Sequence, residues 1–263
     1  MDNELYERAF HEESLEGGYV PNGLFLFDTT PSTNDEIVKL ADKGAPEGTL
    51  AIGAKQTMGQ GRSGRSFFSP DGGNLYMSFL LRPSRYVKME LITPAAAVAT
   101  VRGIKRVTGI DTEIKWVNDI YLGNKKISGM IAKAYNIEDK NRMYVVMGIG
   151  INVHMTDEAV PDDIPAYGTL LEHKITAGET DIIPRLAAAI YSEYMKIYTD
   201  IENPDFMDEY RQYSNVIGKN VTYLSGGEER KVKVLTIDDD GAIVVDDNGL
   251  ETSYRDGEIR IQL

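Results

Sequence analysis

The sequence predicts an α+β protein in two parts, a larger domain over residues 1–214 and a small all-β module over residues 215–263. In the larger part, helical segments mix with antiparallel hairpins. The clearest hairpin joins 112–122 to 126–136 through a Gly-Asn turn. From about Asn215 the helical periodicity stops, and short alternating segments separated by turn residues follow. This texture is typical of a small barrel. We therefore expect a mixed or antiparallel sheet flanked by helices, followed by a barrel-like module.

Each element of the larger part has a local signal. Thr33 and Glu36 have the spacing of a capping box, and Gly44 and Gly109 stand where helices commonly end. We expect residues 1–22 to form a short helix or a loose arm, and residues 154–180 to be loop-rich. The expected helices are 32–44, 91–109, 183–201 and 205–214, and the expected strands are 24–30, 49–57, 74–83, 112–122, 126–136 and 143–153. In the small module we expect strands at 219–224, 230–238, 241–247 and 258–263.

Composition excludes several classes of function. The chain has 263 residues, 42% of them hydrophobic, so it can bury a sizeable core. A formal net charge of −13 argues against a nucleic-acid partner. The chain contains no cysteine, which rules out disulfides, thiolate nucleophiles and cysteine-bound metals. The histidines, His11, His154 and His173, are far apart and lack a zinc-binding spacing, so we expect no dedicated metal site.

Targeting signals are also missing from the pattern. The first residues are acidic and polar, without the basic start and apolar middle of a signal peptide. No apolar run approaches the length needed to span a bilayer. We therefore expect a cytoplasmic protein that does not associate with membranes.

A glycine-rich loop at 58–66 is the first candidate site. Gly59, Gly61 and Gly64 match the spacing of a dinucleotide-binding turn, but such a turn must open directly into a helix. Here Pro70 and a Gly-Gly pair follow instead, so that interpretation fails. With its arginines the loop is suited to binding an anion, because guanidinium groups pair well with carboxylate or phosphate. A mobile hairpin loop with solvated arginines is the open alternative.

Two further segments carry polar or glycine-rich patterns. Segment 115–129 holds several lysines with an asparagine and an aspartate, and strand alternation places Lys115 and Asp119 on one face. A solvated hairpin is the alternative, although it accounts poorly for Trp116 in this charged stretch. In 147–153, glycines inside an apolar strand indicate close approach of a ligand or another backbone, or else a bulge. The residues alone thus indicate an enzyme or binding protein for a small anionic ligand.

Five motifs in order resemble those of biotin–protein ligases, also called biotin–[acetyl-CoA-carboxylase] ligases. They are Ser32-Thr33-Asn34, Gly59-Gln60-Gly61-Arg62-Ser63-Gly64-Arg65, Lys115-Trp116-Val117-Asn118-Asp119, Lys126-Ile127-Ser128-Gly129 and Gly148-Ile149-Gly150-Ile151-Asn152. The resemblance runs from about residue 24 to the end of the chain. It implies a class II synthetase-like catalytic domain with an SH3-like β-barrel.

The resemblance also implies a reaction. Biotin and ATP would be the substrates, with Mg²⁺ accompanying the nucleotide. Biotin would first be converted to biotinyl-5′-AMP and then transferred to a lysine of the biotin carboxyl carrier domain of a carboxylase. The enzyme needs no nucleophile of its own for this chemistry, in keeping with the lack of cysteine. Its contribution would be positioning and charge stabilisation.

Roles for individual residues follow from the resemblance. Lys126, Arg62 and Lys115 would stabilise the negative charge that develops during adenylation, and Asp119 would support the magnesium ion or orient Lys115. The implied biotin-binding residues are Ser32, Thr33, Asn34, Gln56, Gly59, Gln60, Gly61, Arg62, Lys126 and Gly129. The implied ATP-binding residues are Arg62, Arg65, Phe67, Lys115, Asn118 and Asn152.

The sequence departs from the family pattern at three positions. Gln60 stands where arginine is usual, Val117 replaces proline, and Phe67 replaces tryptophan. The loss of charge at Gln60 predicts weaker retention of the adenylate, whereas Phe67 keeps an aromatic cover. Few residues precede the ligase pattern, so we expect no DNA-binding domain and no operator binding. The pattern leaves open whether the protein is a monomer or a homodimer.

Two rival functions remain at this stage. A lipoate–protein ligase shares the fold and the chemistry, but the polar cluster of Ser32, Thr33, Asn34 and Gln56 fits a dithiolane ring poorly, because unpaired buried polar groups are costly. A non-catalytic biotin-sensing or carrier-binding module is the other rival. It would be expected to lose Lys126 or Arg62, and both are present.

Overall fold

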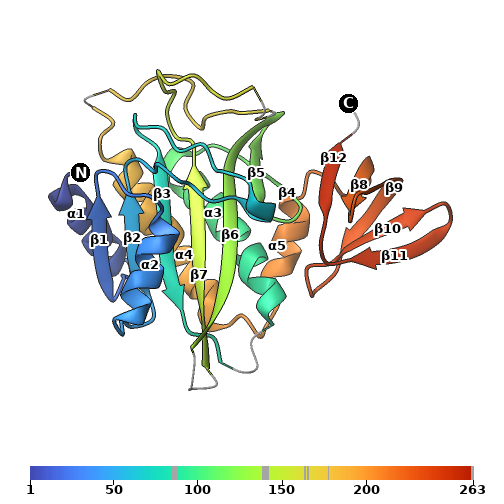
Figure 1. The fold of residues 1–263 in the computed structure, drawn as a ribbon, viewed down its shortest axis with the longest axis horizontal. Coiled ribbons are helices and arrows are strands. Elements are labelled where there is room, and N and C mark those ends of the chain that lie inside the picture. The colour runs from blue at the N-terminus through green and yellow to red at the C-terminus, as the bar shows by residue number, and fades with distance from the viewer. Residues whose placement is uncertain (85–87, 138–141, 163, 165, 177, 262–263) are drawn as a thin grey trace.

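The computed structural model describes residues 1–263 except 85–87, 138–141, 163, 165, 177 and 262–263 (Figure 1). The α-helices are α1 (Asn3–Leu15), α2 (Thr33–Asp42), α3 (Ile92–Thr108), α4 (Ile182–Thr199) and α5 (Phe206–Tyr213), with short 3₁₀ turns η1 (Arg62–Gly64) and η2 (Met89–Leu91). The strands are β1 (Gly23–Phe27), β2 (Thr49–Gly53), β3 (Leu75–Leu81), β4 (Glu113–Lys115), β5 (Asp119–Leu122), β6 (Lys125–Ile137), β7 (Arg142–Ile151), β8 (Asn220–Ser225), β9 (Glu228–Ile237), β10 (Ile243–Asp247), β11 (Leu250–Tyr254) and β12 (Glu258–Ile261).

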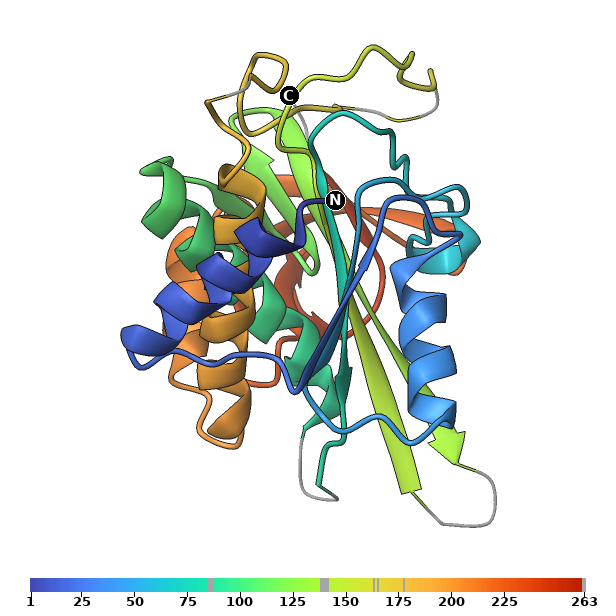
Figure 2. The same cartoon turned by 90° about the vertical axis from the view of Figure 1, so that its left-hand side faces the viewer.

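A seven-stranded sheet forms the centre of the larger part, in the order β1-β2-β3-β7-β6-β5-β4. Only the β1–β2 pair is parallel, and the other neighbours are antiparallel. Helix α2 packs on one face, whereas α1, α3, α4 and α5 lie on the other (Figure 2). The predicted α+β class and the mixed sheet flanked by helices are therefore confirmed.

The N-terminal segment is a helix that belongs to the core, which decides between the two expectations for residues 1–22. Phe10 is buried and meets the ring of Tyr191 edge-on, with centroids 6.0 Å apart. Glu13 is also buried and pairs with Arg106 of α3, with 2.6 Å between Oε2 and the guanidinium nitrogen. This contact fixes α1 against the helical layer.

Helix α2 begins differently from the prediction. The prediction of a Thr33–Glu36 capping box is wrong, because Ser32 is the N-cap residue and no side chain caps the helix. Thr33 Oγ1 instead lies 3.1 Å from Gln56 Oε1 and 2.7 Å from Ser78 Oγ. The hydroxyl that could cap the helix is thus used in a polar network beside the sheet. The predicted ends at Gly44 and Gly109 are confirmed, since both adopt positive φ directly after their helices.

The prediction of one strand over 112–122 is also wrong. The segment folds back on itself as β4 and β5, with Lys115 directly opposite Asp119. Trp116, in the turn between them, is buried and donates from Nε1 to the Gly241 carbonyl at 2.9 Å. Burying this ring against the C-terminal module interrupts the strand. Lys115 and Asp119 still share a face, but because they are cross-strand partners.

The C-terminal module forms a separate antiparallel sheet in the order β11-β10-β9-β8-β12, consistent with an SH3-like fold. Strand β11 is missing from the sequence prediction, although Asn248-Gly249 before it is a hairpin signal, with both residues at positive φ. Arg211 of α5 donates to the Ile237 carbonyl at 3.0 Å and so ties this sheet to the larger part. Within the described residues, no helix combines the length and apolar character needed to cross a membrane.

Candidate active site

A cavity of about 490 Å³ lies on the α2 face of the large sheet, beside the C-terminal module. Its walls come from the start of α2, the glycine loop, five strands of the sheet and the β8–β9 and β11–β12 turns. In Figure 1 the C-terminal module stands beside the β4–β5 edge, where it can contribute to this cavity. Segments from both ends of the chain therefore meet here.

A row of paired residues crosses the sheet below the cavity. Successive neighbours in the row are Tyr76, Gly150, Gly129, Asp119 and Lys115, from β3, β7, β6, β5 and β4. Cross-strand partners point to the same face. The row therefore has two bare glycines in its middle and two charged groups at one end.

The two glycines make room for an aromatic ring. A Cβ atom at Gly150 would lie 2.5 Å from Phe67 Cε1, and one at Gly129 would lie 3.2 Å from Phe67 Cε2. The pairing of β7 with both neighbours is regular here, so the alternative interpretation of these glycines as a β-bulge is wrong. The close approach is made by the side chain of Phe67. This ring covers Gly150 and Gly129, which together form the glycine floor of the cavity.

A chain of short polar side chains lies one step along the same sheet face. Ser78 Oγ donates to Asn34 Oδ1 at 2.7 Å and lies 2.7 Å from Thr33 Oγ1. Gln56 Oε1 accepts from the Thr33 backbone N–H at 2.9 Å, and its Nε2 donates to Ser69 Oγ at 3.0 Å. A Cβ at Gly148 would lie 2.4 Å from Asn34 Oδ1, so this glycine admits the asparagine. The network holds these polar groups in fixed positions.

Two lysines flank one carboxylate at the other end of the row. Lys126 Nζ lies 2.6 Å from Asp119 Oδ1, and both side chains are partly buried. Lys115 lies over the ring of Tyr121, 5.3 Å from its centroid. Burial lowers the pKa of Lys115, and the nearby Asp119 carboxylate opposes that shift. Two cations therefore stand close together, and the Asp119 carboxylate partly offsets their repulsion.

The arginines of the glycine loop are held by acceptors from other parts of the chain. Arg62 donates to Asn118 Oδ1 at 3.0 Å and to Asp256 Oδ1 at 3.2 Å. Arg65 donates to Glu258 Oε2 at 2.5 Å, and this bond lowers the pKa of the Glu258 carboxyl. The carboxylates of the C-terminal module thus occupy guanidinium donors that phosphate oxygens could also use.

Gln60, where the family pattern has arginine, is anchored at both ends. Its Nε2 donates to Asp35 Oδ1 at 2.8 Å, and its Oε1 accepts from Lys133 Nζ at 2.5 Å. Lys133 of β6 therefore carries a positive charge next to Gln60, the position at which the arginine charge of the family pattern is missing. The backbone on either side holds the loop closed, since Phe67 N–H donates to the Gly59 carbonyl at 2.8 Å.

The structure brings most of the predicted site residues to one cavity. Those that line it are Thr33, Asn34, Gln56, Gln60, Gly61, Arg62, Arg65, Phe67, Lys115, Asn118, Asp119, Lys126 and Gly129. Three others lie outside its wall: Ser32, Gly59 and Asn152. Direct ligand contact by these three stays a prediction.

The positions of those three residues indicate supporting roles. A Cβ at Gly59 would lie 2.3 Å from the Phe67 carbonyl, so only glycine lets the two arms of the loop meet. Asn152 Nδ2 donates to the Gly168 carbonyl at 3.0 Å and so fastens the following loop to the end of β7. Ser32 Oγ is buried and has no hydrogen-bond partner among the described residues.

Sequence reasoning missed several residues of the cavity wall. Ser78 could have been found, because a serine in the otherwise apolar run 75–81 is a signal for a polar partner. Lys133, which lies outside the wall but bonds to Gln60 of the wall, stands on a predicted strand and belongs to no motif. Asp256, Glu258 and residues 224–229 come from the C-terminal module, and no pattern in the sequence indicates which of its turns faces the larger part.

Comparison with known proteins agrees with this arrangement. Residues 26–152 match the model of the biotin/lipoate A/B protein ligase family. The chain is 35% identical over 236 residues to the bifunctional ligase/repressor BirA of Bacillus subtilis. The alignment covers 88% of this chain and 72% of that protein. The chain belongs to the biotin/lipoate A/B protein ligase family.

Other members of this family support the assignment. The biotin–[acetyl-CoA-carboxylase] ligase of Mycobacterium tuberculosis is 26% identical over 264 residues, spanning 97% of this chain and 95% of that protein. The solved structure of the biotin protein ligase from Aquifex aeolicus in complex with biotin and ATP has a TM-score of 0.73 and 23% identity, over 92% of this chain and 99% of that one. The latter likeness shows that this ligase family's fold extends to the C-terminal module.

Proposed function

We propose that this protein is an ATP-dependent biotin–protein ligase, a biotin–[acetyl-CoA-carboxylase] ligase, and that the cavity above the glycine floor binds biotin and then its adenylate. The observation that carries the proposal is the continuity of the site: a fixed polar network of Thr33, Ser78 and Asn34 leads across Gly150 and Gly129 to Lys126. A ligand with a polar ring at one end and a carboxylate at the other fits this order of groups.

The polar network would recognise the ureido ring. Asn34 Oδ1 is taken by Ser78, while Asn34 Nδ2 has no acceptor among the described residues and can donate to the ureido carbonyl. The ring of lipoate offers no such partners. A buried polar group left unpaired costs about 1–3 kcal/mol, which corresponds to roughly 5- to 150-fold in affinity for each lost partner. The network therefore favours biotin over lipoate.

Adenylation is a displacement at phosphorus. A carboxylate oxygen of biotin attacks the α-phosphorus of ATP, the bond to the β-phosphate bridging oxygen breaks, and pyrophosphate leaves with that electron pair. Negative charge builds on the non-bridging α-phosphate oxygens, where Lys126 and Lys115 would stabilise it. Asp119 would hold Lys126 in place through its 2.6 Å ion pair. Fixed charges of this kind act without reorganisation during the reaction.

The nucleotide would lie against the glycine loop and the C-terminal module. Arg62 and Arg65 would exchange their carboxylate partners for phosphate oxygens, Phe67 would offer an aromatic face to the base, and Asn118 would hold the nucleotide beside Arg62. Mg²⁺ would enter with the ATP phosphates as part of the substrate. Asn152 would act through the loop it fastens.

Transfer completes the reaction. The ε-amine of a lysine on a biotin carboxyl carrier domain attacks the acyl carbon of the mixed anhydride, AMP leaves, and the amine loses a proton to form the amide. We place the boundary between the catalytic domain and the C-terminal module near residues 214–215, between α5 and β8. The module would contribute Asp256 and Glu258 to the nucleotide side of the cavity.

The test is ATP–pyrophosphate exchange by the purified protein, run with biotin, with lipoate and with neither. Exchange that depends on biotin is the expected result. Exchange with lipoate alone would assign the protein to the lipoate branch of the family. No exchange with either acid, together with measurable biotin binding, would contradict an enzymatic function and favour a biotin-sensing module.

A further inference from the structure

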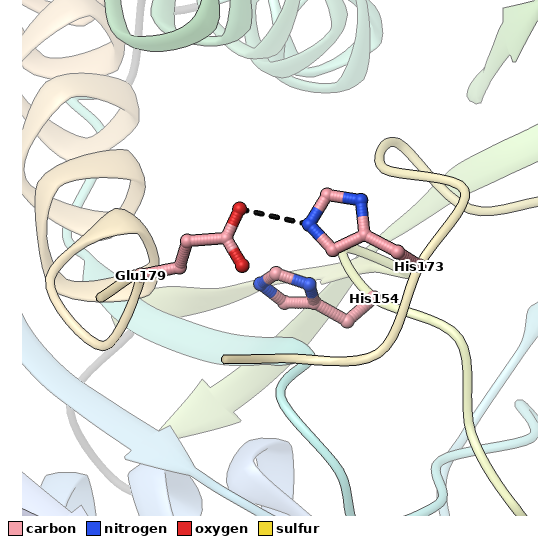
Figure 3. Close-up of side chains that lie close together, drawn as sticks. All are labelled: His154, His173 and Glu179. Carbon is pink, nitrogen blue, oxygen red and sulfur yellow. Dashed lines mark hydrogen bonds and ion pairs between the residues drawn. The ribbon is translucent and has the colours of Figure 1, made fainter. Parts of the chain in front are cut away.

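Two of the three histidines meet a glutamate outside the cavity described above. His154 follows β7, His173 lies in the 154–180 connection, and Glu179 stands just before α4 (Figure 3). One donor atom from each residue lies within 4.8 Å of the others. The sequence predicts no histidine metal site because the spacing follows no motif, yet the fold brings these side chains together.

His154 is the unusual member of this group. Its side chain is fully buried, and neither ring nitrogen has a hydrogen-bond partner among the described residues. Buried polar groups are almost always satisfied, and exceptions call for an explanation such as a bound ion. In Figure 3 the ring lies beside both His173 and Glu179.

Glu179 is oriented by its own neighbour. Thr176 donates from its hydroxyl to Oε2 at 2.7 Å and from its backbone N–H to the same oxygen at 3.3 Å. The other oxygen, Oε1, is directed at His173 Nε2, 2.8 Å away. Hydrogen bonds that orient a carboxylate, as Thr176 orients Glu179, are typical of the groups that surround protein metal ligands.

We propose that His154, His173 and Glu179 form a binding site for a divalent transition-metal ion, with Zn²⁺ as the best match. Two imidazoles and one carboxylate are a donor set that zinc accepts in tetrahedral geometry, with water in the fourth position. Ligand atoms at about 2.0–2.1 Å from a tetrahedral ion stand roughly 3.3 Å apart. The donor atoms lie within 4.8 Å of one another, so no pair needs to approach by more than about 1.5 Å. His173 is about half exposed, which gives the ion a route of entry.

A metal ion at this site would stabilise the 154–180 connection, which contacts the backbone of Lys126. The ion would join the start of the 154–180 connection to its end, and the middle of that connection contacts the catalytic region. Lys126 N–H donates to the Ala166 carbonyl at 2.6 Å, and Gly168 N–H donates to the Lys126 carbonyl at 3.0 Å. A bound ion would thus hold the segment that carries the backbone partners of Lys126. This role is separate from the Mg²⁺ that accompanies ATP.

The experiment measures Zn²⁺ binding by tag-free protein without nucleotide, in competition with a chromophoric chelator. We expect one ion per chain. His173→Gln should weaken binding by at least about tenfold, since it removes one ligand, and Glu179→Gln should do the same. His11→Gln, at an exposed position on α1, is the matched control and should change the affinity less than about twofold. Because His173 is exposed, its variant should fold, and its thermal unfolding without metal should match that of the wild type.

Cobalt gives an independent readout. Co²⁺ in the wild-type site should show the intense visible absorption of a four-coordinate ion, and His173→Gln should lose it. Equal Zn²⁺ affinities of the wild type and His173→Gln would overturn the proposal. So would equal losses in His173→Gln and His11→Gln, because the binding would then not depend on this cluster.

Discussion

A methyl group at position 150 tests whether the glycine floor exists for the ring of Phe67. In Gly150→Ala the new Cβ would lie 2.5 Å from Cε1 and 2.7 Å from Cζ of that ring. Carbon atoms in contact normally stand about 3.5–4.0 Å apart, so the ring must retreat by roughly 1 Å. Phe67 is only partly buried and can move. We therefore expect a stability loss below the ~1–3 kcal/mol typical of overpacking a closed core.

Activity should suffer far more than stability. A displacement of about 1 Å in a group that positions a substrate can cost on the order of 10²-fold in rate. The assay is biotin-dependent ATP–pyrophosphate exchange, paired with thermal unfolding of the free protein. Gly178→Ala is the matched control, because a Cβ there meets nothing within 4 Å. In a Phe67→Ala background, Gly150→Ala should add little. An exchange rate of Gly150→Ala equal to that of the wild type would refute the claim that the glycine floor positions Phe67 for catalysis.

Three further predictions test other parts of the account. Burial lowers the pKa of Lys115 below the ordinary 10.5, so its cation is lost at lower pH than that of an exposed lysine. The exchange rate should fall early on the alkaline side, and Lys115→Arg should move that fall to higher pH; identical profiles would contradict this. Glu258→Gln frees Arg65 for phosphate and should lower the KM for ATP by about two- to fivefold, whereas a raised KM would mean that Glu258 positions Arg65. Gly103→Ala places a Cβ 2.4 Å from Ile190 Cγ1 between α3 and α4, and denaturant unfolding should show a loss of roughly 1–3 kcal/mol; unchanged stability would show that these helices separate freely.

Local signals were enough to predict the elements that have clear periodicity and clear ends. The helix ending at Gly109 and the β5–β6 hairpin lie where the pattern places them. The prediction failed where a side chain serves a distant partner. Thr33 does not cap its helix because it belongs to the pocket network, and Trp116 breaks a strand because it binds the C-terminal module. Such contacts depend on the packed structure, which local propensity does not contain.

The candidate site follows the same division. Lys126, Arg62 and Gly129 belong to motifs, and the structure brings them to one cavity, while their roles toward a ligand stay predictions. Ser78 and Lys133 are single residues on strands. Their partners, Thr33 of α2 and Gln60 of the glycine loop, become known only from the packed structure. The sequence gives no means of pairing Arg62 and Arg65 with the C-terminal module, because the partners are nearly 200 positions away.

The most direct test of the central claim separates binding from chemistry at Lys126. Biotin affinity and single-turnover formation of biotinyl-5′-AMP are measured for the wild type, Lys126→Ala and the neighbouring exposed Lys125→Ala. Because Lys126 is assigned to charge that develops during the reaction, Lys126→Ala should slow adenylation by about 10²-fold or more while weakening biotin binding by less than about tenfold. Lys125→Ala should change neither. Equal losses of rate and affinity in Lys126→Ala would mean that Lys126 only holds biotin, and would contradict the account.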